Sequence, residues 1–113
     1  MTNYESVIIA RQDLASNQLN TIISDMSEII SKNGGQIVRV DSWGLKNLAY
    51  RIKKNRKGHY FLLNISAPAK AVAEYQRILG LNEDVIRFMT IKVDEFSKAG
   101  AEDSKETNEV EGE

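Results

Sequence analysis

The most concentrated group of side chains that could do chemistry in this 113-residue chain is a set of cations in one stretch. Residues 39–58 hold a single acidic side chain, Asp41, and seven basic ones: Arg39, Lys46, Arg51, Lys53, Lys54, Arg56 and Lys57. Tyr50 and His59 lie within or beside this stretch. Cations next to aromatic rings suit contact with nucleic-acid phosphates and stacking on bases. A solvated edge strand, whose charges discourage aggregation, can show the same pattern, so charge alone leaves both interpretations open.

The sequence offers few of the residue types from which catalytic and metal-binding sites are built. His59 is the only histidine and there is no cysteine, which excludes a thiol nucleophile, a disulfide framework and a His/Cys zinc cluster. The Gly34-Gly35 pair precedes an expected strand, and it lacks the helix and lysine that complete a phosphate-binding loop. We therefore expect no enzyme activity, no cofactor and no metal ion.

The net charge of −1 hides an uneven distribution. Residues 97–113 carry six acidic side chains and two lysines, whereas residues 1–96 have a net charge of +3. Val110 is the only large aliphatic residue of the 97–113 stretch, which therefore cannot bury enough apolar area to offset chain entropy. We expect one domain over residues 1–96 and an acidic disordered tail over residues 97–113. Neither a signal peptide nor a membrane span is predicted, which favours a cytoplasmic protein.

Hydrophobic periodicity predicts four strands and two helices that position these residues. The expected strands cover about 4–11, 36–53, 59–67 and 85–93, and the expected helices cover about 14–32 and the segment that begins at Pro68 and ends before Gly80. Asp13 or Ser16 is the expected N-cap of the first helix, residues 55–58 are an expected loop, and Gly80 is expected just beyond the second helix. The order predicts an α+β fold, the ferredoxin-like split β-α-β arrangement (β-α-β-β-α-β), with a four-stranded antiparallel sheet and two helices on one face.

The predicted fourth strand carries hydrophobic side chains on both of its faces. Met89, Ile91 and Val93 form one set, while Ile86 and Phe88 form the other. Because the helices are expected on one side of the sheet only, the other face should be exposed. Large exposed apolar patches usually mark a partner site. We therefore expect Met89, Ile91 and Val93 to bind a protein partner.

The segment around Gly44 resembles the signature of the bacterial ribosomal protein family numbered six in the small subunit. Its matching positions are Gly44, Lys46, Leu48-Ala49-Tyr50 and Ile52-Lys53. Four further pieces agree in order and separation: Tyr4-Glu5, Gly34-Gly35, Gly58-His59-Tyr60 and Val85-Ile86-Arg87. The resemblance covers about residues 3–95, which is everything except the expected tail.

The resemblance implies a structural component of the small ribosomal subunit. Such a protein would bind the central domain of 16S rRNA together with small-subunit ribosomal protein eighteen, with neither a membrane nor a small-molecule substrate as partner. By the match of positions, the resemblance implies RNA contact for Tyr4, Lys46, Tyr50, Arg51, Lys53, Lys54, Arg56, Lys57 and Arg87.

Two alternatives remain at this point. A ferredoxin-like regulatory module could bind a small metabolite as a homodimer, although this function would give the basic stretch no role. An RNA-recognition sheet with stacking aromatic residues is disfavoured, because residues 57–64 depart from the ribonucleoprotein octamer at His59, Tyr60 and Asn64.

Overall fold

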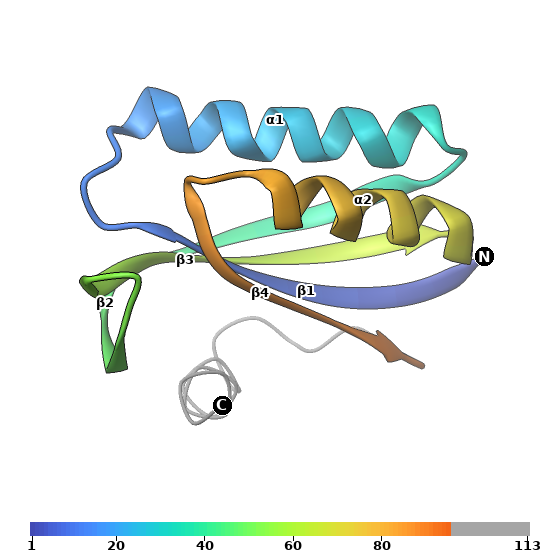
Figure 1. Cartoon of the computed structure of the whole chain (residues 1–113). Helices are drawn as coiled ribbons and strands as arrows, with labels where there is room; N and C mark the ends of the chain where they lie inside the picture. The colour runs from blue at the N-terminus through green and yellow to red at the C-terminus, as the bar shows by residue number, and fades with distance from the viewer. Residues whose placement is uncertain (96–113) are drawn as a thin grey trace.

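The computed structural model describes residues 1–95, which contain the elements in the expected β-α-β-β-α-β order. These are β1 (Thr2–Arg11), α1 (Ser16–Lys32), β2 (Gln36–Ile52), β3 (Asn55–Ala67), α2 (Ala69–Leu81) and β4 (Val85–Val93). The sheet has the order β2-β3-β1-β4 with every neighbouring pair antiparallel. Both helices lie on the same face of the sheet (Figure 1). The predicted ferredoxin-like arrangement is confirmed, whereas the predicted tail over residues 97–113 lies outside the described residues.

β1 and β3 form the centre of the sheet, and their side chains alternate between two hydrophobic clusters. Ile8 and Leu63 belong to the cluster on the helix side, while Val7 and Leu62 belong to a second cluster on the opposite side. Successive side chains of a strand point to opposite faces. The uninterrupted apolar runs in β1 and β3 are therefore strands that are buried on both faces.

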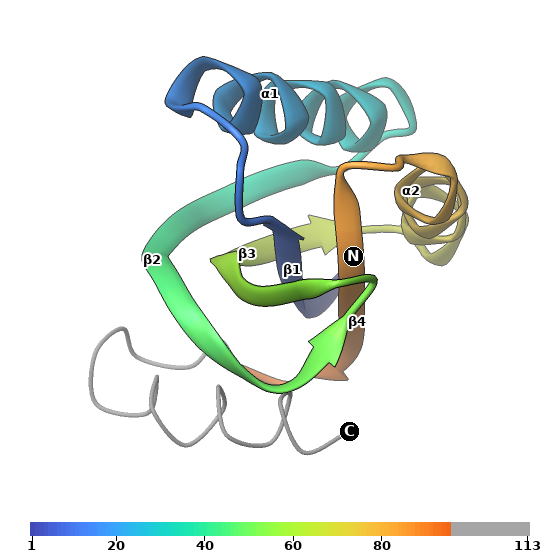
Figure 2. The same cartoon turned by 60° about the vertical axis from the view of Figure 1, so that its left-hand side comes forward.

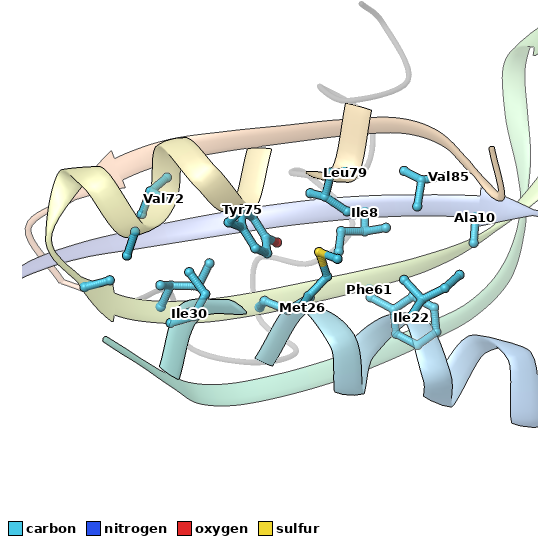
Figure 3. Packing of buried hydrophobic residues seen from close by; sticks show 14 of the residues in the cluster. Ile8, Ala10, Ile22, Met26, Ile30, Phe61, Val72, Tyr75, Leu79 and Val85 are labelled. Carbon is cyan, nitrogen blue, oxygen red and sulfur yellow. The ribbon is translucent and has the colours of Figure 1, made fainter. Parts of the chain in front are cut away.

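Each helix covers the sheet with one apolar stripe (Figure 3). The buried residues are Leu19, Ile22, Met26 and Ile30 in α1, and Ala71, Val72, Tyr75 and Leu79 in α2. Their spacing of three or four places them on a single helix face. The Tyr75 hydroxyl donates a hydrogen bond to Ser6 Oγ (2.7 Å), and Thr90 Oγ1 donates to the same oxygen (3.0 Å). Burial raises the pKa of the Tyr75 phenol above its ordinary value, although the hydrogen bond to Ser6 acts in the opposite direction.

Two predicted helix ends are wrong. α1 is capped by Ala15 rather than by Asp13 or Ser16, and the Gln18 side chain accepts a hydrogen bond from the Ala15 backbone N–H (2.8 Å). Gln18, at position N3, thus satisfies the backbone N–H of the N-cap residue, which is the contact that the N3 side chain makes in a capping box. α2 continues through Gly80, because the backbone there is not in the left-handed region that ends a helix.

The sheet face away from the helices is partly covered, contrary to the expectation that it would be exposed. β2 curves away from the helices and returns through the β2–β3 hairpin (Figure 2). Trp43, Leu48 and Ile52 from this hairpin pack against the second cluster. The Trp43 ring stacks on that of Tyr60, with centroids 6.4 Å apart and planes 17° apart. The hairpin is therefore anchored to the sheet by its own hydrophobic residues.

Candidate nucleic-acid interface

The β2–β3 hairpin carries most of the residues expected to contact RNA, and two irregularities set its path. Gly44 has a φ of +83°, and the β2–β3 register shifts between Ser42 and Gly44. Glycine adopts such a φ without steric cost, so the predicted bend at Gly44 is confirmed. A second shift places residues 48–51 of β2 opposite residue 56 of β3 alone. This bulge lets β2 depart from regular pairing where it carries Tyr50 and Arg51.

A two-residue turn, Lys53-Lys54, joins the two strands. The predicted loop over residues 55–58 is wrong, because β3 begins at Asn55. Lys53 and Lys54 have φ values of 48° and 71°, in the left-handed region. The Asn55 Nδ2 donates hydrogen bonds to the carbonyl oxygens of Ile52 (3.2 Å) and Lys53 (3.0 Å). The first residue of β3 therefore stabilises the turn before it.

The turn is also held against the loop that joins β1 to α1. Asn55 Oδ1 accepts a hydrogen bond from the Gln12 backbone N–H (3.2 Å), and Gln12 Oε1 accepts one from the Lys57 backbone N–H (3.1 Å). Asn55 is buried, whereas Gln12 is exposed. We call this set of contacts the Asn55–Gln12 clamp. Sequence reasoning missed both residues, because no local pattern links positions that are 43 residues apart.

The hairpin presents cations without carboxylate partners. Five are exposed and form no ion pair with any residue from 1 to 95: Arg51, Lys53, Lys54, Arg56 and Lys57. Lys46 is half-buried, and its Nζ lies 5.9 Å from the centroid of the Trp43 ring, close enough for a cation–π interaction. No acidic residue occurs from 46 to 57. The hairpin therefore has a positive surface that can accept phosphates.

The remaining residues expected to contact RNA lie in three places. Tyr50 is 59% exposed and belongs to the hairpin. Arg87 pairs with Ile9 across β1 and β4, and therefore lies on the sheet face that the hairpin covers. Tyr4 lies near the start of β1, where it packs against the helix-side cluster. The structure thus brings the hairpin residues together but does not bring Tyr4 to them.

A depression of about 390 Å³ lies beside the turn, between Lys53, Lys54 and the β1–α1 loop. Its charges are mixed, because Arg11 lies there together with Asp13, to which it is paired at 2.9 Å. Among residues 1–95, no group of three or more potential metal ligands occurs. The depression therefore has neither the charge of an anion site nor the ligands of a metal site. No helix in this part of the chain is long and apolar enough to cross a membrane.

Met89, Ile91 and Val93 lie together on β4, which is an edge strand of the sheet. They share the face turned away from the helices, as the pairing of Met89 with Val7 shows. Met89 packs against the second cluster, whereas Ile91 is 50% exposed. Part of the predicted partner surface is therefore accessible and part supports the sheet.

Comparison with known proteins adds information that the geometry does not carry. The family model "Ribosomal protein S6" matches residues 3–92. The "Small ribosomal subunit protein bS6" of Caulobacter vibrioides is 56% identical over 96 residues, which is 85% of this chain and 76% of that protein. The protein of the same description from Paramagnetospirillum magneticum is 51% identical over 98 residues, covering 87% of this chain and 68% of its own length.

Two solved structures share the fold. The 30S ribosomal protein S6 from Thermotoga maritima has a TM-score of 0.76 at 20% identity and covers 96% of this chain and 97% of its own. The C-terminal domain of the MgtC protein from Mycobacterium tuberculosis has a TM-score of 0.58 at 11% identity, covering 88% and 94%. Because proteins with such different names share this architecture, the fold does not decide the function.

Proposed function

The chain belongs to the ribosomal protein S6 family, and from this premise we propose that it binds the central domain of 16S rRNA together with small-subunit ribosomal protein eighteen. Family membership makes it a component of the small ribosomal subunit, in the cytoplasm and associated with ribosomal RNA. The RNA domain and the protein partner are the parts that we propose. The role is that of a scaffold rather than an enzyme.

The observation that carries the proposal is the set of five exposed hairpin cations without carboxylate partners among the described residues. Phosphate contacts supply most of the affinity of nucleic-acid binding and set its dependence on salt. The hairpin offers these contacts from one continuous stretch of chain. Exposed Tyr50 adds a ring that can stack on an unpaired base.

The need for a protein partner follows from the small charge of the domain. Residues 1–96 carry a net charge of only +3, so the domain alone would hold RNA weakly at physiological salt. A second contact through Ile91 and its neighbours Met89 and Val93 would raise the local concentration of RNA around the hairpin. A homodimeric metabolite-binding module, the alternative considered above, would leave the five hairpin cations without a role.

The test is a charge reversal on the hairpin. Lys53, Lys54, Arg56 and Lys57 changed together to Glu should weaken joint binding to a transcript of the central domain of 16S rRNA, in the presence of small-subunit ribosomal protein eighteen. Because fewer phosphates are contacted, the dependence of affinity on salt should also flatten. Filter binding at several salt concentrations measures both effects.

The matched control reverses cations on the helix side, Lys32→Glu and Lys70→Glu. It should leave RNA binding within about twofold of the wild type, because exposed charges far from a site are screened at physiological salt. Equal binding by the hairpin variant and the wild type would contradict the proposed RNA surface. Equal binding of the wild type with and without the protein partner would contradict joint binding.

A further inference from the structure

The Lys53-Lys54 turn adopts a backbone conformation that its residue types do not favour. Both residues have left-handed φ values, 48° and 71°. Two-residue hairpin turns with two positive φ angles favour Asn-Gly, because a Cβ atom crowds the following carbonyl oxygen in this conformation, glycine has none, and the short Asn side chain can form a compensating local hydrogen bond. Hairpin stability therefore does not account for lysine at either position. Two adjacent cations at the tip of a hairpin are, however, what a phosphate-binding surface requires.

The conformation is maintained by residues that carry no charge themselves. Asn55 is 8% exposed, and its side chain donates hydrogen bonds to the carbonyl oxygens of Ile52, the last residue of β2, and of Lys53, the first residue of the turn. Gln12, from the β1–α1 loop, contacts Asn55 through its backbone and Lys57 through its side chain. The tip of the hairpin is thus attached to a part of the chain 43 to 45 residues away.

We propose that Asn55 and Gln12 are positioning residues of the RNA-binding surface: they hold the Lys53-Lys54 backbone in one conformation and in one place relative to the sheet. This inference rests on the proposed binding of rRNA by the hairpin. Preorganisation raises affinity because less conformational freedom is lost when the complex forms. The clamp would therefore increase affinity without adding a charge or a direct contact to the RNA.

The experiment is a double-mutant cycle on the full chain, with the central-domain 16S rRNA transcript and small-subunit ribosomal protein eighteen as the probe. Gln12→Ala leaves the charge unchanged and removes the side-chain oxygen that accepts from the Lys57 N–H, while the hydrogen bond from the Gln12 backbone to Asn55 is kept. It should weaken RNA binding by about three- to tenfold through lost preorganisation. Lys53→Gln with Lys54→Gln should weaken binding and lower the slope of affinity against salt by about 1.4, or 0.7 per lost phosphate contact.

The triple variant distinguishes positioning from a general structural role. If the clamp acts through the two lysines, then Gln12→Ala should cause no further loss in the Lys53→Gln, Lys54→Gln background. Asn55→Ala should behave in the same way, with circular dichroism at the assay temperature showing that it is folded. If Asn55→Ala does not fold, the Gln12→Ala cycle alone decides. Gln36→Ala, at an exposed glutamine away from the hairpin tip, is the matched control and should bind like the wild type.

Two results would overturn the inference while leaving the proposed function intact. One is that Gln12→Ala binds RNA like the wild type although the lysine variant is weakened. The other is that the effects of Gln12→Ala and the lysine changes add fully, which would show that the clamp does not act through the turn. A lysine variant that binds RNA with the affinity and salt slope of the wild type would instead refute both the inference and the RNA surface on which it rests.

Discussion

The free energy of unfolding should fall less steeply at alkaline pH when Tyr75 is replaced by phenylalanine, because the buried Tyr75 phenol contributes to that fall. The Tyr75 side chain is fully buried, and its hydroxyl donates to Ser6 Oγ at 2.7 Å. Burial raises the pKa of this phenol in the folded protein. In the unfolded chain a tyrosine ionises near pH 10. Above about pH 10 the unfolded chain therefore loses a proton that the folded protein keeps, and the free energy of unfolding falls as the pH rises.

Two contributions set the difference in free energy of unfolding between wild type and Tyr75→Phe: the lost hydrogen bond and the ionisation of Tyr75 in the unfolded chain. At neutral pH, Tyr75→Phe loses one hydrogen bond and should lower the free energy of unfolding by about 1 kcal/mol. Above pH 10, ionisation of the unfolded chain lowers the wild-type value by about 1.4 kcal/mol per pH unit, and the variant lacks this contribution. The two curves should therefore cross at a pH of about 10.7.

Urea unfolding followed by circular dichroism from about pH 7 to 11.5 measures both curves. Tyr50→Phe is the control, because it removes a phenol hydroxyl from a side chain that is 59% exposed rather than buried. A difference between wild type and Tyr75→Phe that stays constant across this range would refute the reasoning. It would mean that the Tyr75 phenol ionises in the folded protein as readily as in the unfolded chain.

Two further predictions concern packing. Met26→Ala should lower the free energy of unfolding by about 2–5 kcal/mol, because Met26 is 1% exposed in the helix-side cluster and its removal leaves a cavity. The control is Asn20→Ala, on the exposed side of α1, which should change the free energy of unfolding by less than about 0.5 kcal/mol in the same urea titration. Gly58→Ala should cost about 1–3 kcal/mol, because a Cβ at this position would overlap Ile9 Cγ2. The cost should shrink in an Ile9→Ala background, and an unchanged cost there would show that the overlap is not its source.

The arrangement of the elements could be predicted because it depends on patterns within single segments. The apolar run at Val7–Ala10 and the helical spacing of Leu19, Ile22, Met26 and Ile30 each specify an element and its buried side. Gly44 marked a bend by its residue type alone, and its φ of +83° confirms it. The concentration of cations in 46–57 was likewise visible without the structure.

The features that could not be predicted depend on contacts between distant residues or on competition between equivalent local signals. The sequence assigned Asn55 to a loop, whereas β3 begins at this residue. The two features that place it there, the tight Lys53-Lys54 turn and the hydrogen bond to Gln12, are visible only in the structure. A turn of two lysines has none of the residue types that usually announce one. Ala15 is the N-cap of α1, and the Gln18 side chain accepts a hydrogen bond from its N–H. Asp13 and Ser16 are better capping residues by type, so the sequence favoured them.

The central position of β1 has a consequence for the order of events during synthesis. β1 lies between β3 and β4, and Asn3 pairs with Val93 at the other end of the described chain. Until β4 has been made, one edge of β1 has backbone groups without partners, although its residues Ile8 and Ile9 are fully buried in the finished fold. At about 5–20 residues per second, β1 waits roughly 4 to 16 s for β4. During this interval the N-terminal strand is the part of the nascent chain with the greatest need of protection from pairing with other chains.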